Sequence, residues 1–205
     1  MKIAVLGANG RTGEVFVKFA LKNGHQINAG VFGSHRFNPE EALKIIPCDG
    51  ANSEQVESLV KGCDAVVCLI GHVKGSPATV QTQSTKNIIS AMELLSIKRL
   101  VSLTGTGARQ PGDKVSWADR LLNLGVSLVD PNRVSDGKLH LEELKSSNLD
   151  WTVVRVLKLQ NTRPKRFILK LNGPPKIITS REEVAESILQ VLEQKSFIRQ
   201  SPIIG

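Results

Sequence analysis

The sequence contains no tyrosine, and aromatic residues make up only 4% of its 205 residues. No phenol hydroxyl is therefore available to donate or accept a proton in catalysis. Every apolar run is too short to cross a bilayer, and the N-terminus leads directly into an apolar strand pattern rather than a charged and then apolar signal segment. We therefore expect a cytoplasmic protein with no membrane contact.

Cysteine is also scarce, with Cys48, Cys63 and Cys68 as the complete set. Their number is odd, and their spacing matches no paired zinc-ligand pattern. Cys68 lies within an apolar run, where a small buried thiol is the simplest interpretation. We expect no metal site and no redox role for these thiols.

Basic residues outnumber acidic ones by 27 to 19, which gives a formal net charge of +8. The basic residues are dispersed, with local clusters only at 163–166 and 195–199. No basic helix interleaved with aromatic residues occurs, so nucleic-acid binding is not favoured. A positive surface that attracts an anionic cofactor or substrate explains the charge equally well.

The first twenty residues carry the strongest motif in the chain. An apolar run at 3–6 predicts a buried strand, Gly7, Gly10 and Gly13 follow at a spacing of three, and an apolar pattern with helical period comes next. Strand, glycine turn and helix are the context of a dinucleotide-binding fingerprint, here in the variant form GxxGxxG. The turn and the helix start therefore predict a pyrophosphate site, whose residues are Gly7, Asn9, Gly10, Arg11, Thr12 and Gly13.

The end of the second predicted strand bears on cofactor choice. NAD-specific folds place an acid about 20 residues past the glycines, but here no acid precedes Glu40. Ser34 and Arg36 stand in this segment, and a hydroxyl with a guanidinium suits a 2′-phosphate. The segment favours NADP, with NAD still possible. Alternatively, the two residues are simply solvated.

Strand and helix patterns alternate along the whole chain with no break in composition. This alternation predicts a doubly wound parallel α/β sheet, the Rossmann fold, as a single domain over 1–205 with small C-terminal elements on the substrate side. Ligands of such sheets bind beyond the carboxyl ends of the strands. The predicted strands are 3–6, 26–32, 44–48, 64–71, 98–104, 149–157 and an edge strand at 203–204. The first predicted helix ends near residue 23, and the others span 53–60, 79–96, 118–124, 137–147 and 180–193.

Several short segments together carry a resemblance to one family. The segments are Gly7-Ala-Asn-Gly-Arg-Thr-Gly13, Cys48-Asp49-Gly50, 64–71, 86–89, 147–155 and 178–185. With these segments, the chain resembles the NmrA-like, NAD(P)H-binding group of atypical short-chain dehydrogenases/reductases, and the flavin/biliverdin-IXβ reductases look like its closest catalytic relatives. The similarity spans nearly the whole chain.

The resemblance implies a role for each part of the predicted site. The glycine turn would hold the pyrophosphate, and Ser34 with Arg36 the 2′-phosphate. Phe32 stands where the group often has Arg, and the sequence after Arg155 is Val-Leu-Lys, where relatives often have Pro. The remaining implied contacts are Asp49 and Gly50 with adenine, Leu69, Ile70 and Gly71 with the adenosine ribose, Thr104 with the nicotinamide ribose, and Val156 and Leu157 with the nicotinamide.

The missing tyrosine limits the chemistry. Short-chain dehydrogenases that interconvert alcohols and ketones use a Tyr-x-x-x-Lys pair, and this chain has no Tyr. Lys138 lies near the family's helical lysine and would contact the nicotinamide ribose, or be an ordinary solvated residue. A flavin-, quinone- or tetrapyrrole-like acceptor needs no such pair, because its ring delocalises the charge and solvent can protonate it.

Two functions therefore stay open. In the first, the protein is an NADPH-dependent reductase in which Thr104 or Thr106 positions the nicotinamide and polarises a small-molecule acceptor, whose pocket the loops 72–77, 106–114 and 157–163 would form. In the second, it is a non-catalytic NAD(P)-sensing regulatory protein whose cofactor occupancy changes affinity for a protein partner. Both functions need the same cofactor site.

Overall fold

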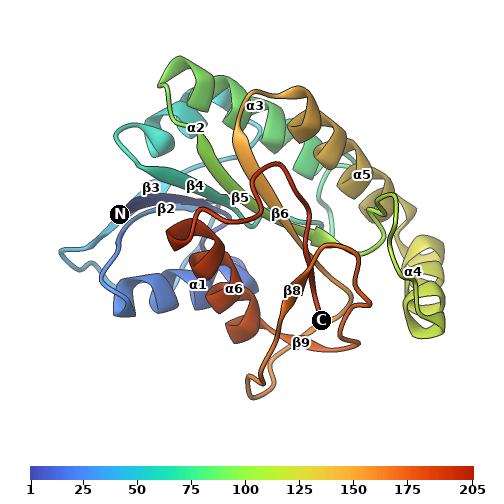
Figure 1. The fold of residues 1–205 in the computed structure, drawn as a ribbon. Coiled ribbons are helices and arrows are strands. Elements are labelled where there is room, and N and C mark those ends of the chain that lie inside the picture. Colours follow the sequence, from blue (N-terminus) through green and yellow to red (C-terminus); the bar gives the residue numbers. More distant parts are fainter.

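An eight-stranded sheet runs through the computed structural model, which describes residues 1–205, in the order β3-β2-β1-β4-β5-β6-β10-β8 (Figure 1). All neighbouring strands from β3 to β10 pair in parallel, and β8 pairs antiparallel with β10. The predicted doubly wound parallel sheet is confirmed. The strands are β1 Lys2–Leu6, β2 Gln26–Val31, β3 Leu43–Pro47, β4 Ala65–Cys68, β5 Arg99–Gly105, β6 Asp150–Val156, β7 Leu159–Gln160, β8 Leu169–Lys170, β9 Thr179–Ser180 and β10 Ile203–Ile204.

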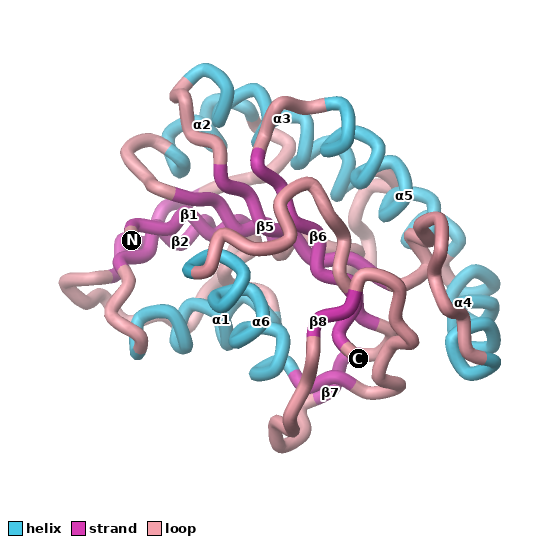
Figure 2. The backbone as a smooth tube through the Cα atoms, viewed as in Figure 1, coloured by secondary structure: helices cyan, strands magenta, loops and turns pink.

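Helices cover both faces of this sheet (Figure 2). Helices α1 and α6 pack on one face, α2, α3 and α5 on the other, and α4 packs beside α5 at the end of the layer. The central strands β1 and β4 are therefore buried on both sides, which explains their unbroken apolar sequences. The helices are α1 Arg11–Lys22, α2 Ser53–Val60, α3 Val80–Leu94, α4 Trp117–Val129, α5 Pro131–Ser146 and α6 Arg181–Glu193.

Side-chain caps set where most of these helices begin. Asn52 and Ser116 accept hydrogen bonds from the third residue of α2 and α4, at 3.0 and 3.2 Å. Ser180 and Glu183 form the reciprocal capping box that the sequence predicted for α6. Helix α1 differs, because its N-cap is Gly10 and no side chain caps it.

The structure corrects the sequence prediction mainly after residue 116. Helices α4 and α5 are longer than the predicted 118–124 and 137–147, since Asp130 caps a new helix and Pro131 occupies its first turn. The predicted strand 64–71 already ends at Cys68, and the short strands β7, β8 and β9 were not predicted. Residues 203–204 do form a strand, but β8 pairs outside it, so it is not the edge.

No helix of the structure combines the length and apolar character that a bilayer crossing requires.

Candidate functional site

The predicted cofactor residues meet at the carboxyl edge of the sheet, where direct contacts join consecutive loops. The loop after β1 touches the loop after β4, because Gly7 lies against the backbone of Leu69 and Ile70. The side-chain amide of Gln81 then joins β4 to β5 by donating to the carbonyl oxygens of Ile70, at 3.0 Å, and Leu103, at 3.2 Å. The sequence did not single out Gln81.

Two glycines of the fingerprint are required by geometry. Gly7 has φ +73°, and a Cβ there would lie 3.1 Å from the backbone nitrogen of Ile70. A Cβ on Gly13 would lie 2.2 Å from the carbonyl oxygen of Gly7 and 2.5 Å from that of Ala8. Helix α1 can therefore approach the turn this closely only without side chains at these positions.

The first turn of α1 presents unpaired donors beside these glycines. The backbone N–H groups of Arg11, Thr12 and Gly13 donate to no acceptor in the chain. Together with the positive end of the helix dipole, they form an anion site. A dinucleotide pyrophosphate fits this cradle.

Asn9, predicted to contact the cofactor, uses its side chain to organise the loops around it. Its amide donates to the carbonyl oxygens of Phe32 and Ser34, both at 2.8 Å. These bonds hold the loop after β2 beside the glycine turn. Ser34 and Arg36 are exposed there, and the guanidinium of Arg36 pairs with no acid.

The loop after β3 forms the next part of the same edge. Asp49 accepts a hydrogen bond from the backbone N–H of Ala51 at 2.9 Å, and Gln55 accepts one from the backbone N–H of Asp49 at 2.7 Å. Gly50 packs so closely that an added Cβ would lie 2.5 Å from the side chain of Ile70. The structure thus brings Asp49 and Gly50 next to the end of β4, as the sequence predicted.

Arg181 is a residue that the sequence analysis missed. It opens α6, is 8% exposed, and donates to the side chain of Asn161 at 2.6 Å, while its Nε lacks an acceptor. Burial lowers the pKa of Arg181, and the nearby charge of Arg11 lowers it further. A basic residue in a first turn opposes the helix dipole, and this unfavourable placement was the available sequence signal.

The two threonines after β5 differ in their surroundings. The Thr106 hydroxyl donates to Asp119 at 2.7 Å and accepts from Asn123 at 3.1 Å, so its single donor hydrogen is already used. The Thr104 hydroxyl makes no hydrogen bond. Gly137 of α5 packs against it, because a Cβ added to Gly137 would lie 2.8 Å from the Thr104 hydroxyl oxygen. Thr104 therefore presents an unpaired hydroxyl at this end of the sheet.

The other residues predicted to lie near the nicotinamide offer no free polar group that is held in place by its contacts. Lys138 follows Gly137, but its side chain is exposed and forms no ion pair. Val156 packs in the core and accepts a hydrogen bond from the backbone of Thr106 at 3.0 Å. Leu157 is half-buried just beyond β6.

A buried carboxylate fixes the elements around Thr104. Asp136 of α5 is 1% exposed and accepts bonds from the backbone N–H groups of Gln81 and Thr82, at 2.8 and 2.9 Å. It also accepts from the Thr82 hydroxyl and pairs with Nε2 of His72 at 2.9 Å. Asp136 therefore caps α3 from another helix and holds the loop after β4.

His140, one turn further along α5, is buried in a different environment. Its Nε2 lies 3.0 Å from the Ser102 hydroxyl, and its Nδ1 has no partner. Burial lowers the pKa of His140 to about 4, although the charge of Asp136 acts in the opposite direction. The ring is neutral at pH 7 and is closed off from any substrate.

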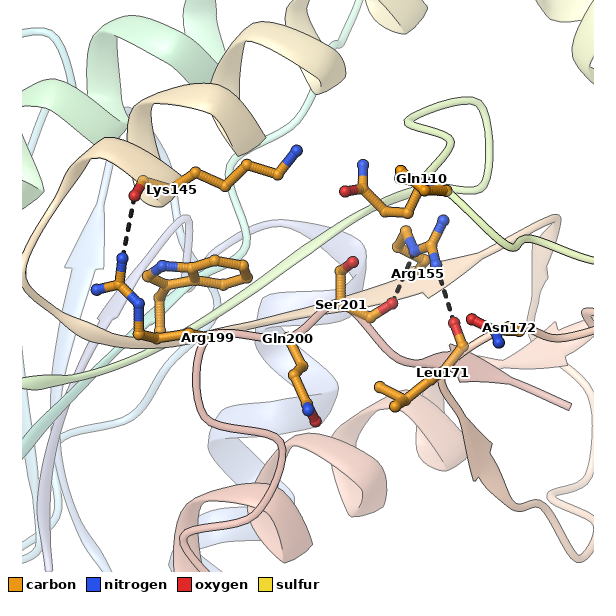
Figure 3. A pocket seen from close by; sticks show the side chains of 10 residues that line it. Gln110, Lys145, Arg155, Leu171, Asn172, Arg199, Gln200 and Ser201 are labelled. Carbon is orange, nitrogen blue, oxygen red and sulfur yellow. Dashed lines mark hydrogen bonds between the residues drawn. The ribbon is translucent and has the colours of Figure 1, made fainter.

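Arg155 supports the substrate-side loops from the end of β6. It pairs with Asp113 through two nitrogens, one at 2.8 Å. Figure 3 shows it between Ser201 and Leu171, with a bond to the carbonyl oxygen of each, beside a polar cavity of about 280 Å³. This fully buried guanidinium joins the loops after β5 and β8 to the segment before β10.

A larger groove of about 800 Å³ opens between the loop after β4 and the helices α4 and α5. Its polar wall consists of residues 72–76 with Asp130, Asn132 and Arg133, and its other wall consists of apolar α4 residues. His72, which belongs to the polar wall, directly follows Gly71 in the chain, so the groove adjoins the predicted cofactor loop after β4. Thr104 and Gly137 do not line it.

The three thiols and the metal-ligating side chains form no further site. Burial raises the pKa of Cys48 to about 12 and the pKa values of Cys63 and Cys68 to about 11, so all three are protonated and unreactive at pH 7. No three His, Cys, Asp or Glu side chains are grouped to hold a metal ion.

The amino-acid sequence of the chain is similar to those of known proteins. Residues 7–195 match the sequence model of a family described as NAD(P)H-binding. An uncharacterised chloroplast protein of Arabidopsis thaliana is 29% identical over 96% of this chain and 74% of its own length. The chloroplast protein TIC 62 of Pisum sativum is 22% identical over 75% of this chain, but over only 32% of its own length. The expected cytoplasmic location stays a prediction.

Solved structures share the fold at low sequence identity. A short-chain dehydrogenase/reductase of Veillonella parvula, in complex with NADP, superposes with a TM-score of 0.83 at 20% identity, covering 100% of this chain and 94% of that one. A Streptococcus pneumoniae protein proposed to be an NADH–flavin reductase superposes with a TM-score of 0.78 at 21% identity, covering 100% and 98%.

Proposed function

Because the chain belongs to the NAD(P)H-binding family, we propose that it is an NADPH-dependent reductase of the atypical, NmrA-like short-chain type. Its substrate is a flavin-, quinone- or tetrapyrrole-like acceptor. Bound NADPH supplies a hydride, and the acceptor gains that hydride and one proton from solvent, so two electrons are transferred. No Tyr–Lys pair takes part.

The residues of this chain hold and orient the cofactor. The free N–H groups of the first turn of α1 bind the pyrophosphate. The positive charges of Arg11 and Arg181, which lie close to each other, attract this negatively charged group. Arg36, exposed and without an ion-pair partner, binds the 2′-phosphate and favours NADPH over NADH.

The observation that carries the proposal is a groove of about 800 Å³ whose wall includes His72, the residue directly after the predicted cofactor loop that ends at Gly71. The groove lies within the size range of small-molecule sites. A groove of this size next to the loop after β4 supports turnover of a bulky ring. The unpaired hydroxyl of Thr104 can bond to the nicotinamide ribose.

A panel of acceptors tests the proposal. Purified protein is mixed with NADPH and, in turn, with FMN, menadione and biliverdin, and oxidation is followed at 340 nm. We expect at least one acceptor to be reduced faster than its background rate. Tight cofactor binding that distinguishes NADPH from NADP, with no turnover of any acceptor, would instead support the sensing function.

Replacement of Arg36 tests the cofactor preference separately. Arg36→Ala should raise the Kd for NADPH by roughly tenfold, the effect of one lost charge-assisted bond, and leave the Kd for NADH nearly unchanged. Equal effects on both cofactors would show that Arg36 does not contact the 2′-phosphate.

A further inference from the structure

Helix α4 exposes far more apolar surface than any other helix of the protein. Trp117, Leu121, Leu124 and Leu128 form a continuous stripe at helical spacing and are 58–78% exposed. Only Ala118 and Asp119 of this helix are buried. An apolar surface of this kind marks an interaction site in a folded protein.

The stripe continues into the groove described above. Leu121 belongs to both, and Leu122, Val126 and Val129 extend the apolar wall of the groove toward the loop at 72–76. The opposite wall carries His72, Lys74 and Arg133. The groove is therefore amphipathic.

Gly125 lies in the middle of α4 and lines the same groove. Glycine within a helix is less favourable than alanine. Packing does not require it here, because a Cβ at Gly125 would meet no atom within 4 Å. The missing side chain leaves the groove open beside the helix.

We propose that this groove binds an acceptor that carries an aliphatic chain, a quinone with an alkyl or prenyl tail, with its ring beside Arg133 and its tail along α4. The proposal rests on the reductase function and specifies its substrate class. Arg133 can donate to a ring oxygen, because one of its terminal nitrogens is bonded to the carbonyl oxygen of His72 and the other is not bonded. The apolar wall and the adjoining stripe exceed what a ring alone would cover.

Two quinones with the same ring test the tail. Decylubiquinone and its tail-less analogue are compared by KM in NADPH oxidation and, independently of turnover, by equilibrium dialysis against the NADP-bound protein. We expect the decyl compound to bind at least about tenfold more tightly, which requires burial of only about two methylene groups. Gly125→Leu should abolish this difference by filling the groove.

Arg120→Leu is the matched control, since it adds a leucine to an exposed position of α4 outside the groove. It should keep the wild-type difference between the two quinones. Thermal unfolding of both variants shows that each is folded, and Gly125→Leu should be at least as stable as the wild type.

The outcomes separate this proposal from the reductase function. Turnover of both quinones with equal KM, unaffected by Gly125→Leu, overturns the tail site and keeps the reductase. Gly125-dependent binding of the decyl quinone without turnover keeps the tail site and overturns the reductase. A dimer that Leu124→Gln dissociates, with no tail preference, assigns the stripe to a second copy and overturns the tail site.

Discussion

At the scale of single residues, the fingerprint depends on one close approach. Gly13→Ala would place a methyl group 2.2 Å from the carbonyl oxygen of Gly7, so α1 must shift away from the turn. We expect this variant to lose at least about tenfold in NADPH affinity, because the free N–H groups no longer point at one phosphate. Calorimetric titration with NADPH measures the loss.

Gly24→Ala provides the control for this substitution. Gly24 has φ +78° with open space around a Cβ, so alanine there strains only the local backbone, by about 1–2 kcal/mol. Its NADPH affinity should match that of the wild type. If both variants lost affinity equally, general destabilisation rather than the cradle would be the cause.

The two threonines predict opposite phenotypes. Thr104→Val removes a hydroxyl that has no partner, so stability should change by less than about 1 kcal/mol, while kcat/KM for the acceptor falls about 10²-fold. Thr106→Val removes a donor to buried Asp119 and should cost about 1–3 kcal/mol in stability. Urea unfolding and steady-state kinetics on both variants check this. Similar phenotypes for the two would contradict the assignment.

At the scale of elements, Asp136 joins α5, α3 and the loop after β4. Asp136→Asn replaces one acceptor oxygen with an amide N–H₂ that faces the backbone N–H donors of α3. This loss of an acceptor should destabilise the protein by about 3 kcal/mol. Asp130→Asn, at the half-buried cap of α5, should cost less than about 1 kcal/mol because asparagine caps equally well. Urea unfolding at pH 7 gives both values, and a small effect at position 136 would show that α3 does not need this cap.

The sequence predicted those elements whose signals are local. The glycine turn with its flanking strand and helix, the buried strands β1 and β4 and the capping box at Ser180 each occupy one short segment. Helices α4 and α5 were predicted too short because Gly125, Pro131 and Gly137 indicate loops. In the structure, Pro131 starts a helix and the two glycines are tolerated inside helices.

The site was predicted where it depends on the ends of strands and missed where it depends on distant pairings. The roles of Asp136 toward α3 and of Arg181 beside Arg11 join segments far apart in the chain, which no periodicity reveals. Asn9 was assigned to the cofactor from its place in the motif, whereas its amide holds the loop after β2.

At the scale of the whole molecule, the buried His140 makes stability depend on pH. Its pKa is about 4 when folded and about 6.5 when unfolded, so the unfolded state binds the extra proton between these values. His140 therefore favours the folded state above pH 6.5 and loses this contribution, about 3 kcal/mol, as the pH falls toward 4. His140→Gln should show a flatter stability profile from pH 6.5 to 4. Parallel profiles for variant and wild type would show that His140 does not titrate as described.

The proposed function is hydride transfer from NADPH to a ring acceptor by a protein without tyrosine. An anaerobic single-turnover reaction of the protein–NADPH complex with decylubiquinone, followed at 340 nm and repeated with NADPH deuterated at the transferred position, tests this step itself. We expect loss of absorbance well above the background rate, slowed by the deuterium and nearly abolished in Gly13→Ala. An absorbance trace identical to that of NADPH and quinone without protein would contradict it.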